Sequence, residues 1–363
     1  MKLCDLSTGD AVYRYEKSIV VFFKGKRKVL STSVFNGGYS EGFTAVFNHD
    51  ATQSKGMPCK MYADTYDAHM RIVAEKIGLQ ADEVSGMGTA ASMDNVAIVS
   101  ESYKDLTVTA IVTGGIETNG GRVGDPSDYY KPLIKDLKPG TINIILVLDA
   151  DMQPGTLTRA LVTCTEAKTA AIQELMAGSN YSTGLATGSG TDQTMIIVNA
   201  ESNIYLESTG KHSKTGELIG KVVMRAVKEA LYKETGLCPS SQHSALKRFK
   251  RFKVTEDTLW NSFKEQNDRT IIKPVFLEIL DPIEKDSFIV ANTSLYIHLL
   301  DQYLWGLLEE KEVVVCAQKV LLLIGEKYGV KAKNILKEVS IEAFNTAWVE
   351  VVVEILHEKA AES

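Results

Sequence analysis

The sequence has few cysteines and histidines, and neither residue type is clustered. Its 363 residues include five cysteines, an odd number at widely separated positions, with no CxxC pair. A disulfide framework is therefore not expected, and reduced cysteines fit a cytoplasmic protein. The six histidines show no HxxxH or HxH spacing. We therefore predict no bound metal and an activity that does not depend on a divalent metal.

Long apolar runs and an excess of basic charge are also missing. The nearly apolar stretch at 313–324 is interrupted by Gln318 and Lys319, so neither a transmembrane segment nor a membrane partner is expected. The N-terminus reaches Asp5 without an apolar core, which argues against a secretory signal. Forty basic and 46 acidic side chains give a net charge of −6, which does not favour a nucleic-acid partner.

Glycine is common in the first two thirds of the chain and scarce in the last third. Residues 1–239 hold 24 of the 27 glycines, whereas residues 240–363 hold only Gly306, Gly325 and Gly329. Because glycine allows tight turns and lets backbone approach a ligand closely, we place the chemistry in a domain at 1–239. Residues 240–363 carry apolar residues at helical spacing and predict an all-helical domain used for packing or for a homo-oligomer.

The pattern within residues 1–239 mixes strands with helices. Two pairs of β-rich runs separated by short polar turns predict hairpins, at 18–23 with 27–31 and at 95–100 with 106–112. Further strands are predicted at 141–148, 195–198 and 204–206, and helices at 62–77, 154–177 and 216–235. This mixture indicates the α+β class, with a layered domain whose largely antiparallel or mixed sheet is packed by helices.

Two segments rich in glycine and polar residues precede the buried strand. The amides of the first could face a ligand, or could simply close a turn. The second follows a strand and has five glycines within residues 114–124. Its backbone N–H groups could bind an oxyanion or a phosphate, although Asn-Gly-Gly also suits a hairpin turn. The residues singled out in these segments are Asn36, Asn48, Thr113, Gly114, Gly115 and Asn119.

A third segment runs from the predicted strand into the helix that follows it. Thr141 and Asn143 begin the strand at 141–148. Glu166 and Lys168 lie on opposite edges of the apolar stripe of the helix, each about 100° from it. Such edge residues either reach into a cleft or remain in solvent.

A fourth segment, at 184–192, combines hydroxyl groups, glycines and one carboxylate. It lacks the lysine of the GxxxxGK[ST] phosphate loop and does not complete GxGxxG. The strand predicted after it would present these groups from a rigid base. His212, in a loop before the last helix of this domain, is either an acid–base catalyst or an exposed loop histidine. The residues singled out in the fourth segment are Thr187, Gly188, Ser189, Gly190, Thr191 and Asp192.

In their order along the chain, these segments resemble the adenosylcobinamide amidohydrolase family. The similarity covers about residues 16–235, whereas residues 240–363 lie outside it. Ser189 stands where the family often has a threonine. Five motifs carry the resemblance: TxGxxxN at 113–119, PGTINIILV at 139–147, TEAKTAAIQEL at 165–175, ATGSGTD at 186–192 and STGKHSKTGELIGKVV at 208–223.

The resemblance implies an archaeal-type amidase of cobinamide salvage. Such an enzyme hydrolyses the aminopropanol amide bond of adenosylcobinamide to adenosylcobyric acid and 1-aminopropan-2-ol, in support of cobalamin biosynthesis. The expected partner is the corrinoid substrate, and no cofactor is expected. The corrinoid-binding signature DxHxxG is absent, so cobalt would enter only as part of the substrate.

Amide hydrolysis requires a nucleophile, donors for the oxyanion and an acid that protonates the leaving amine. From residue chemistry alone, we expect catalysis from Asp192, Glu166, His212 and Thr191. We expect substrate contacts from Asn36, Asn48, Thr113, Gly114, Gly115, Asn119, Thr141, Asn143, Lys168, Thr187, Gly188, Ser189 and Gly190. Two alternatives remain open at this point: a non-catalytic corrinoid-binding protein, and a small-metabolite kinase with a Gly/Ser-rich phosphate loop.

Overall fold

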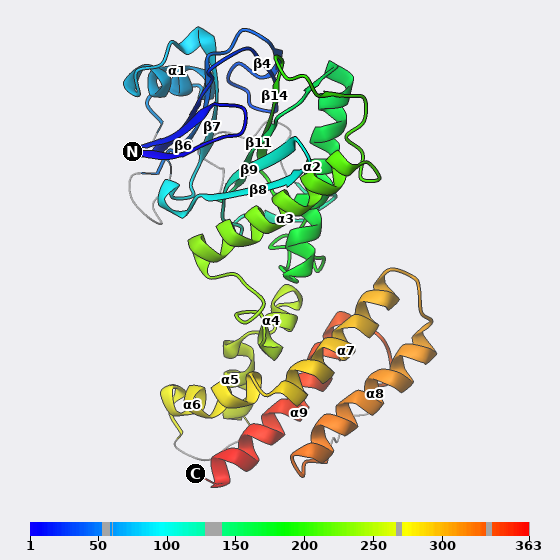
Figure 1. The fold of residues 1–363 in the computed structure, drawn as a ribbon. Coiled ribbons are helices and arrows are strands. Elements are labelled where there is room, and N and C mark those ends of the chain that lie inside the picture. Colours follow the sequence, from blue (N-terminus) through cyan, green and yellow to red (C-terminus); the bar gives the residue numbers. More distant parts are fainter. Residues whose placement is uncertain (53–58, 60, 128–139, 266–270, 332–335, 363) are drawn as a thin grey trace. The chain divides into compact units, whose positions relative to one another are not determined.

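The computed structural model describes residues 1–52, 59, 61–127, 140–265, 271–331 and 336–362. The chain divides into two compact units, Met1–Cys238 and Pro239–Ser363, and each is described by itself (Figure 1). Among the described residues, no helix is both long enough and apolar enough to cross a membrane.

Strands of the first unit are β1 (Lys2–Asp5), β2 (Ala11–Tyr15), β3 (Ser18–Phe22), β4 (Arg27–Ser31), β5 (Gly38–Ser40), β6 (Ala45–Asp50), β7 (Val84–Thr89), β8 (Ala97–Tyr103), β9 (Leu106–Gly114), β10 (Gly120–Gly121), β11 (Ile142–Leu148), β12 (Asp151–Met152), β13 (Gly188–Ser189), β14 (Gln193–Asn199) and β15 (Tyr205–Leu206). They form one sheet in the order β1-β2-β3-β6-β7 and a second in the order β5-β4-β14-β11-β9-β8. Within these sheets β6–β7 and β11–β14 are parallel, and the remaining neighbours are antiparallel. Two short pairs, β10–β13 and β12–β15, complete the described strands.

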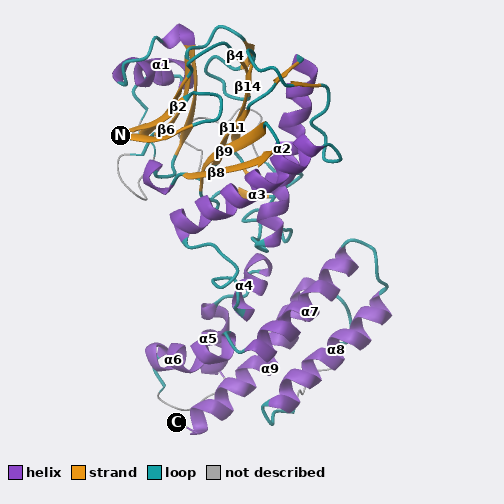
Figure 2. Ribbon diagram, in the orientation of Figure 1, coloured by secondary structure: helices purple, strands orange, loops and turns teal. Residues whose placement is uncertain are grey.

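The two sheets pack face to face and are covered by helices on their outer faces (Figure 2). Alternate residues of β11 explain its continuous apolar run: Ile145 faces the first sheet, whereas Ile144 faces the helices α2 (Pro154–Glu174) and α3 (Lys214–Thr235). Helix α1 (Tyr66–Lys76) packs its buried Met70 on the outer face of the first sheet. The layers therefore follow the order helix, sheet, sheet, helices, which confirms the predicted α+β class.

Several predicted elements are found with small shifts. The hairpin at 95–100 and 106–112 is present as β8 and β9. The buried strand at 141–148 corresponds to β11, and the helix at 154–177 to α2. Helix α1 begins four residues later than predicted, because Thr65 caps its N-terminus by accepting a hydrogen bond from the Ala68 amide.

The hairpin predicted at 18–23 and 27–31 is wrong, although both strands exist. Strand β3 pairs with β2 and β6 in the first sheet, whereas β4 pairs with β5 and β14 in the second. The chain changes sheet between them, at a corner fixed by Asp10. The carboxylate of Asp10 accepts the Lys24 amide and two guanidinium nitrogens of Arg27, each at 2.8 Å, and both charged side chains are buried. A charge pair buried at this corner is not visible in the alternation of apolar residues.

Among the described residues of the second unit, the secondary structure consists of helices joined by loops, without strands. Its helices are α4 (Ala245–Phe249), α5 (Glu256–Glu265), α6 (Lys273–Glu284), α7 (Ser287–Leu304), α8 (Glu310–Lys327) and α9 (Ile341–Glu362). Trp348 is buried in its core against Phe249, with ring centroids 4.4 Å apart. The buried Arg251 guanidinium donates two hydrogen bonds to Asp301. This confirms the predicted helical C-terminal region.

Candidate active site

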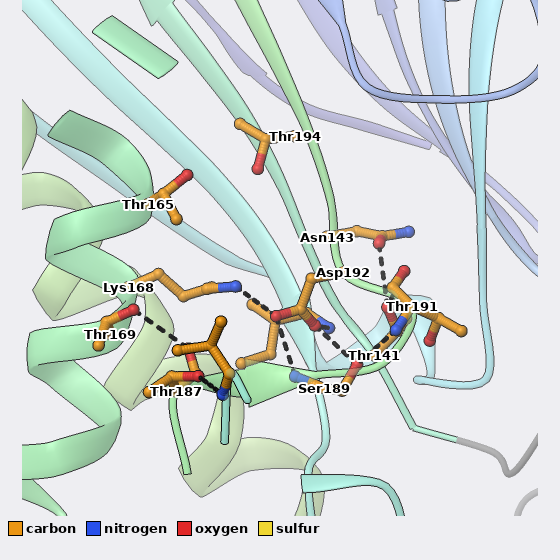
Figure 3. Close-up of polar contacts among 12 residues, drawn as sticks. Thr141, Asn143, Thr165, Lys168, Thr169, Thr187, Ser189, Thr191, Asp192 and Thr194 are labelled. Carbon is orange, nitrogen blue, oxygen red and sulfur yellow. Dashed lines mark hydrogen bonds and ion pairs between the residues drawn. The ribbon is translucent and has the colours of Figure 1, made fainter. Parts of the chain in front are cut away.

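Asp192 is the residue immediately before β14, and its carboxylate is surrounded by donors (Figure 3). One carboxylate oxygen, Oδ1, accepts the Ile142 amide at 2.8 Å and the Ser189 hydroxyl at 2.7 Å. The other, Oδ2, accepts the Ser189 amide at 3.0 Å and forms an ion pair with the ammonium of Lys168. We call Lys168, Ser189 and Asp192 the ion-pair cluster. Its carboxylate is held in one orientation by groups from three parts of the chain.

Glycine at position 188 is required by the geometry of this cluster. Strand β13 pairs with β10, with Gly188 opposite Gly121. A Cβ atom at Gly188 would overlap Asp192 Oδ2 and lie 2.7 Å from Lys168 Nζ. Any side chain there would therefore separate the lysine from the aspartate.

A second group of contacts joins three of the four polar segments. The carbonyl of Gly140 accepts the Thr191 hydroxyl and the Asn119 side-chain amide, both at 3.0 Å. Thr141 Oγ1 in turn donates to the Thr191 carbonyl at 2.7 Å. Gly140 has a φ of +120°, a backbone conformation that residues other than glycine rarely adopt. The segments around 119, 140 and 191 therefore meet beside Asp192.

A buried amide cluster links the two sheets at the same end of β11. Asn143 donates from Nδ2 to Asn48 Oδ1 at 2.8 Å and to the Gly88 carbonyl at 3.0 Å. Asn48 donates to Thr113 Oγ1 at 2.8 Å. These three side chains are at most 4% exposed. They hold the sheets in a fixed spacing next to the ion-pair cluster, and their polar atoms are already used by one another.

Tyr66 and Gln193 belong to the same region but were not predicted. The Tyr66 hydroxyl accepts the Gly88 amide at 2.7 Å and Gln193 Nε2 at 3.2 Å. Burial raises the pKa of Tyr66, so its hydroxyl stays protonated at neutral pH. Gln193 directly follows Asp192 in the sequence, so its place beside Asp192 could have been noticed. In the structure it pairs in register with Asn143. Nothing in the sequence connects Tyr66 with this end of the sheets.

Glu166 and His212 lie outside the ion-pair cluster. The Glu166 carboxylate pairs with Lys211 at 3.0 Å, and both side chains are about half exposed. The exposed His212 helps to line a cavity of about 300 Å³ at the start of α3, together with Arg159, Ser208, Gly210, Lys211 and Ser213. Glu166 and Lys168 are two positions apart on α2, hence about 200° apart around the helix. Only Lys168 points inward and is buried. The four residues expected to catalyse therefore do not form one group.

Two expected substrate contacts are engaged elsewhere. Asn36 donates to the carbonyls of Ala81 and Val84, at the start of β7 rather than at the end occupied by Gly88. The Gly115 amide donates to the Thr141 carbonyl at 3.0 Å and is not available to an oxyanion. At Gly114, a side chain would press on Ile142, with its Cβ 3.2 Å from Cγ1, so glycine is needed there for packing.

Within the described residues, no three His, Cys, Asp or Glu side chains are grouped as a metal site would require.

Comparisons with known proteins agree with the sequence motifs. The model of the adenosylcobinamide amidohydrolase family matches residues 3–239. An uncharacterized protein of Methanocaldococcus jannaschii is 36% identical over 238 residues, which cover 62% of this chain and 89% of that protein. The adenosylcobinamide amidohydrolase of Methanosarcina mazei is 26% identical over 223 residues, covering 59% of this chain and 95% of the relative.

Among solved structures, a protein of Pyrococcus horikoshii aligns with 64% of this chain and 79% of its own. Its TM-score is 0.31 and its identity is 13%, so this likeness supports no argument about fold or function. The family model spans nearly all of the first unit and more than half of the chain. On that match, the chain belongs to the adenosylcobinamide amidohydrolase family.

Proposed function

We propose that this chain hydrolyses the amide bond between the corrinoid and its aminopropanol arm in adenosylcobinamide. Water adds its oxygen to the carbonyl carbon, the C–N bond breaks, and a proton passes to the departing nitrogen. The products are adenosylcobyric acid and 1-aminopropan-2-ol, and the reaction serves corrinoid salvage in the cytoplasm. Membership of the family supports the reaction class. The buried ion-pair cluster supports the proposed location of the active site.

The observation that carries this proposal is the buried ammonium of Lys168. Its side chain is 11% exposed, and within the described residues Asp192 is its one hydrogen-bond partner. An ammonium group has three hydrogens, so two remain for a substrate oxygen. A charge removed from water interacts more strongly with the oxyanion of a tetrahedral intermediate than an exposed charge would. Lys168 is therefore the proposed oxyanion stabiliser.

Asp192 is proposed to position Lys168 and Ser189. Its carboxylate accepts four hydrogen bonds, from Lys168, Ser189 and Ile142, and so holds these groups in place. The Ser189 hydroxyl donates to Asp192, and its oxygen accepts the Thr191 amide at 3.3 Å, which leaves one lone pair for a substrate. The attacking oxygen is then either that of Ser189 or that of a water beside it. Thr191 is less suited to attack, because its hydroxyl donates to Gly140.

The kinase alternative receives no support from the geometry. A phosphate loop usually leads into a helix N-terminus, whereas the segment at 184–192 leads into strand β14. A corrinoid carrier would use the same surface but would bind the substrate without releasing an amine.

Purified full-length protein incubated with adenosylcobinamide tests the proposal, with free 1-aminopropan-2-ol as the readout. Wild-type protein is expected to release the amine, and Lys168→Met to lose most of this activity. Lys211→Met is the matched control, because Lys211 is an exposed lysine that pairs with Glu166 outside the cluster. Corrinoid binding without amine release would favour the carrier instead. Residues 1–239 alone are expected to retain activity, since the family match ends there.

A further inference from the structure

Tyr181 is an exposed aromatic residue that is held unusually firmly. Its side chain is 40% exposed. The hydroxyl donates to Asn119 Oδ1 at 2.8 Å, and the backbone amide donates to Ser179 Oγ at 3.0 Å. The ring lies over Gly121, where a Cβ atom would be 3.2 Å from the ring carbon Cδ2. Isolated exposed aromatics are ordinary, but one fixed at both ends presents a preorganised face.

Backbone hydrogen bonds join the segment at 180–187, which carries Tyr181, to the segment at 120–121. The Asn180 amide donates to the Gly120 carbonyl at 2.9 Å, and the Thr187 amide to the Gly121 carbonyl at 2.8 Å. The amide of Val123 donates to Thr187 Oγ1 at 2.9 Å, while the side chain of Val123 remains 82% exposed. We call Gly121, Val123 and Tyr181 the platform.

The carboxylate of Asp125 accepts hydrogen bonds from both loops of the platform. It accepts the Arg122 amide at 2.7 Å and the Ser179 hydroxyl at 2.6 Å. Burial would raise the pKa of Asp125, but hydrogen bonds from Ser179, Ser182 and Arg122 outweigh it and hold the pKa below its usual value. The carboxylate therefore stays charged and keeps the two loops together.

The platform adjoins the ion-pair cluster through a short chain of contacts. Asn119 accepts the Tyr181 hydroxyl and donates to the Gly140 carbonyl, which also accepts Thr191. Strand β10, which contains Gly121, pairs with β13, which contains Ser189 of the cluster. A Cβ atom at Gly190 would lie 3.8 Å from the Asn119 side-chain amide. The aromatic ring and the reactive groups are therefore joined through Asn119 and through the β10–β13 pair.

We infer that the corrin macrocycle rests on Tyr181 and Val123 while its aminopropanol amide reaches Lys168. This inference rests on the proposed function and adds the part of the surface that recognises the ring. A macrocycle is broad, flat and largely apolar on its face, and such a face stacks on an exposed aromatic ring. Val123 adds a second exposed apolar side chain to the platform, and the absence of a side chain at Gly121 leaves room for the Tyr181 ring.

Binding and turnover of the full-length protein test this inference together. Rapid mixing with adenosylcobinamide, followed before turnover, gives Kd, and amine release gives kcat and KM. Tyr181→Ala is expected to raise Kd and KM about tenfold, the loss of one stacked aromatic contact, with kcat changed less than about threefold. Val123→Ser is expected to raise Kd about threefold.

Two variants separate ring contact from structural effects. Tyr181→Phe removes the hydrogen bond to Asn119 but keeps the ring, so its Kd is expected to stay near wild type. Tyr232→Ala removes a tyrosine that is 59% exposed on α3, outside the platform, and is expected to change neither constant. Equal losses in Tyr181→Phe and Tyr181→Ala would assign the effect to Asn119 and overturn the inference.

The adenosyl group is a second flat group that could stack on Tyr181. Dicyanocobinamide has the same macrocycle without the adenosyl group, and Tyr181→Ala is expected to weaken its binding as much as that of adenosylcobinamide. A loss seen only with adenosylcobinamide would place adenine on Tyr181 and overturn the inference. If wild-type protein releases amine but Tyr181→Ala keeps its Kd and KM, the platform is wrong and the proposed function stands. If wild-type protein neither binds nor hydrolyses the corrinoid, both proposals fail.

Discussion

Lys168 of α2 and Asp192 at the entrance of β14 form an ion pair, with each side chain only 11% exposed. Burying two charges is tolerated only where they are paired and their remaining hydrogen-bonding capacity is largely used. Here the aspartate uses its capacity fully, while the lysine does not. The unequal use of hydrogen bonds points to the lysine as the member of the pair that meets the substrate.

Asp192→Asn tests this pair with little change of shape. The substitution removes the negative charge that positions Lys168 and accepts the Ser189 hydroxyl. Loss of a positioned acid–base or orienting group lowers kcat by about 10²–10⁴-fold. Corrinoid binding should change far less; amine release measures the turnover, and rapid mixing followed before turnover measures the binding. A folded variant that keeps more than about a third of wild-type turnover would move the chemistry away from Asp192.

Glu166→Gln is the matched control for Asp192→Asn. Glu166 is about half exposed and its described ion pair is with Lys211, outside the ion-pair cluster. Exposed ion pairs contribute about 0–1 kcal/mol, so turnover and stability should both stay near wild type. A loss as large as that of Asp192→Asn would restore Glu166 as a catalytic residue.

Gly188→Ala and Gly190→Ala form a second matched pair. The added methyl at 188 would overlap Asp192 Oδ2 and press on Lys168, whereas at 190 the nearest atoms are 3.8 Å away. We expect Gly188→Ala to lower kcat by at least about tenfold through displacement of the ion pair, and Gly190→Ala to retain most activity. Equal activity of the two variants would show that the exact placement of Lys168 is unimportant.

Asn143→Ala is expected to destabilise the first unit. It leaves Asn48 Oδ1 and the Gly88 carbonyl buried without their donor, at about 1–3 kcal/mol for each group. All three tryptophans lie in residues 240–363, so tryptophan fluorescence follows the second unit. Hydrogen exchange of the β11 and β14 amides follows the first. Asn180→Ala, which removes one exposed hydrogen bond to Glu117, should leave that exchange almost unchanged.

The stability of the first unit should fall in mild acid because of His49. Burial, with nearby positive charge from His69, Lys17 and Lys76, lowers the pKa of His49 to about 4 from an ordinary value of 6.5. The folded state then binds fewer protons than the unfolded state, so stability is complete above pH 6.5 and is lost as pH falls toward 4. The full loss is about 3 kcal/mol once the pH is below 4, of which about 2 kcal/mol is reached at pH 5.

Hydrogen exchange of β6 and β7 at pH 7.5 and pH 5 measures this loss, and His49→Gln provides the comparison. The variant should show a smaller change between the two pH values. A residual change is expected, because burial also lowers the pKa of His69. An unaltered pH dependence in His49→Gln would contradict the assignment.

The sequence was sufficient for elements whose signals are local. The continuous apolar run at 141–148 and the proline-to-glycine span at 154–178 correspond to β11 and α2. Within the glycine- and hydroxyl-rich segment at 184–192, Ser189 contacts Asp192 through both its amide and its hydroxyl.

Features that depend on long-range packing could not be predicted in this way. The orientation of Lys168 relative to Glu166 depends on which side of α2 meets the sheet. Tyr66 reaches Gln193 from 127 positions away. The placement of β3 and β4 in different sheets depends on the buried ion pair formed by Asp10 and Arg27.

The final prediction concerns the second unit, which the sequence predicts to serve packing or a homo-oligomer, and takes up self-association through its helices. One face of α8 exposes Val315 (52%) and Leu322 (40%), with Lys311 and Glu326 beyond them at the two ends. These four residues lie within an arc of about 60°. If two copies of α8 pair antiparallel about a twofold axis between residues 318 and 319, Val315 meets Leu322 of the second copy. The same register places Lys311 opposite Glu326.

This register predicts how substitutions on α8 change the dissociation constant of the dimer. Leu322→Asp should raise the dissociation constant of the dimer at least about tenfold, because an apolar side chain would no longer be buried. Lys311→Glu and Glu326→Lys should each weaken association, and the double variant should recover it, since opposite charges again face each other. Leu295→Ser, at a position 59% exposed on α7, is the control and should have no effect. Sedimentation equilibrium compares wild type with all five variants, and a double variant no tighter than either single variant would exclude this register.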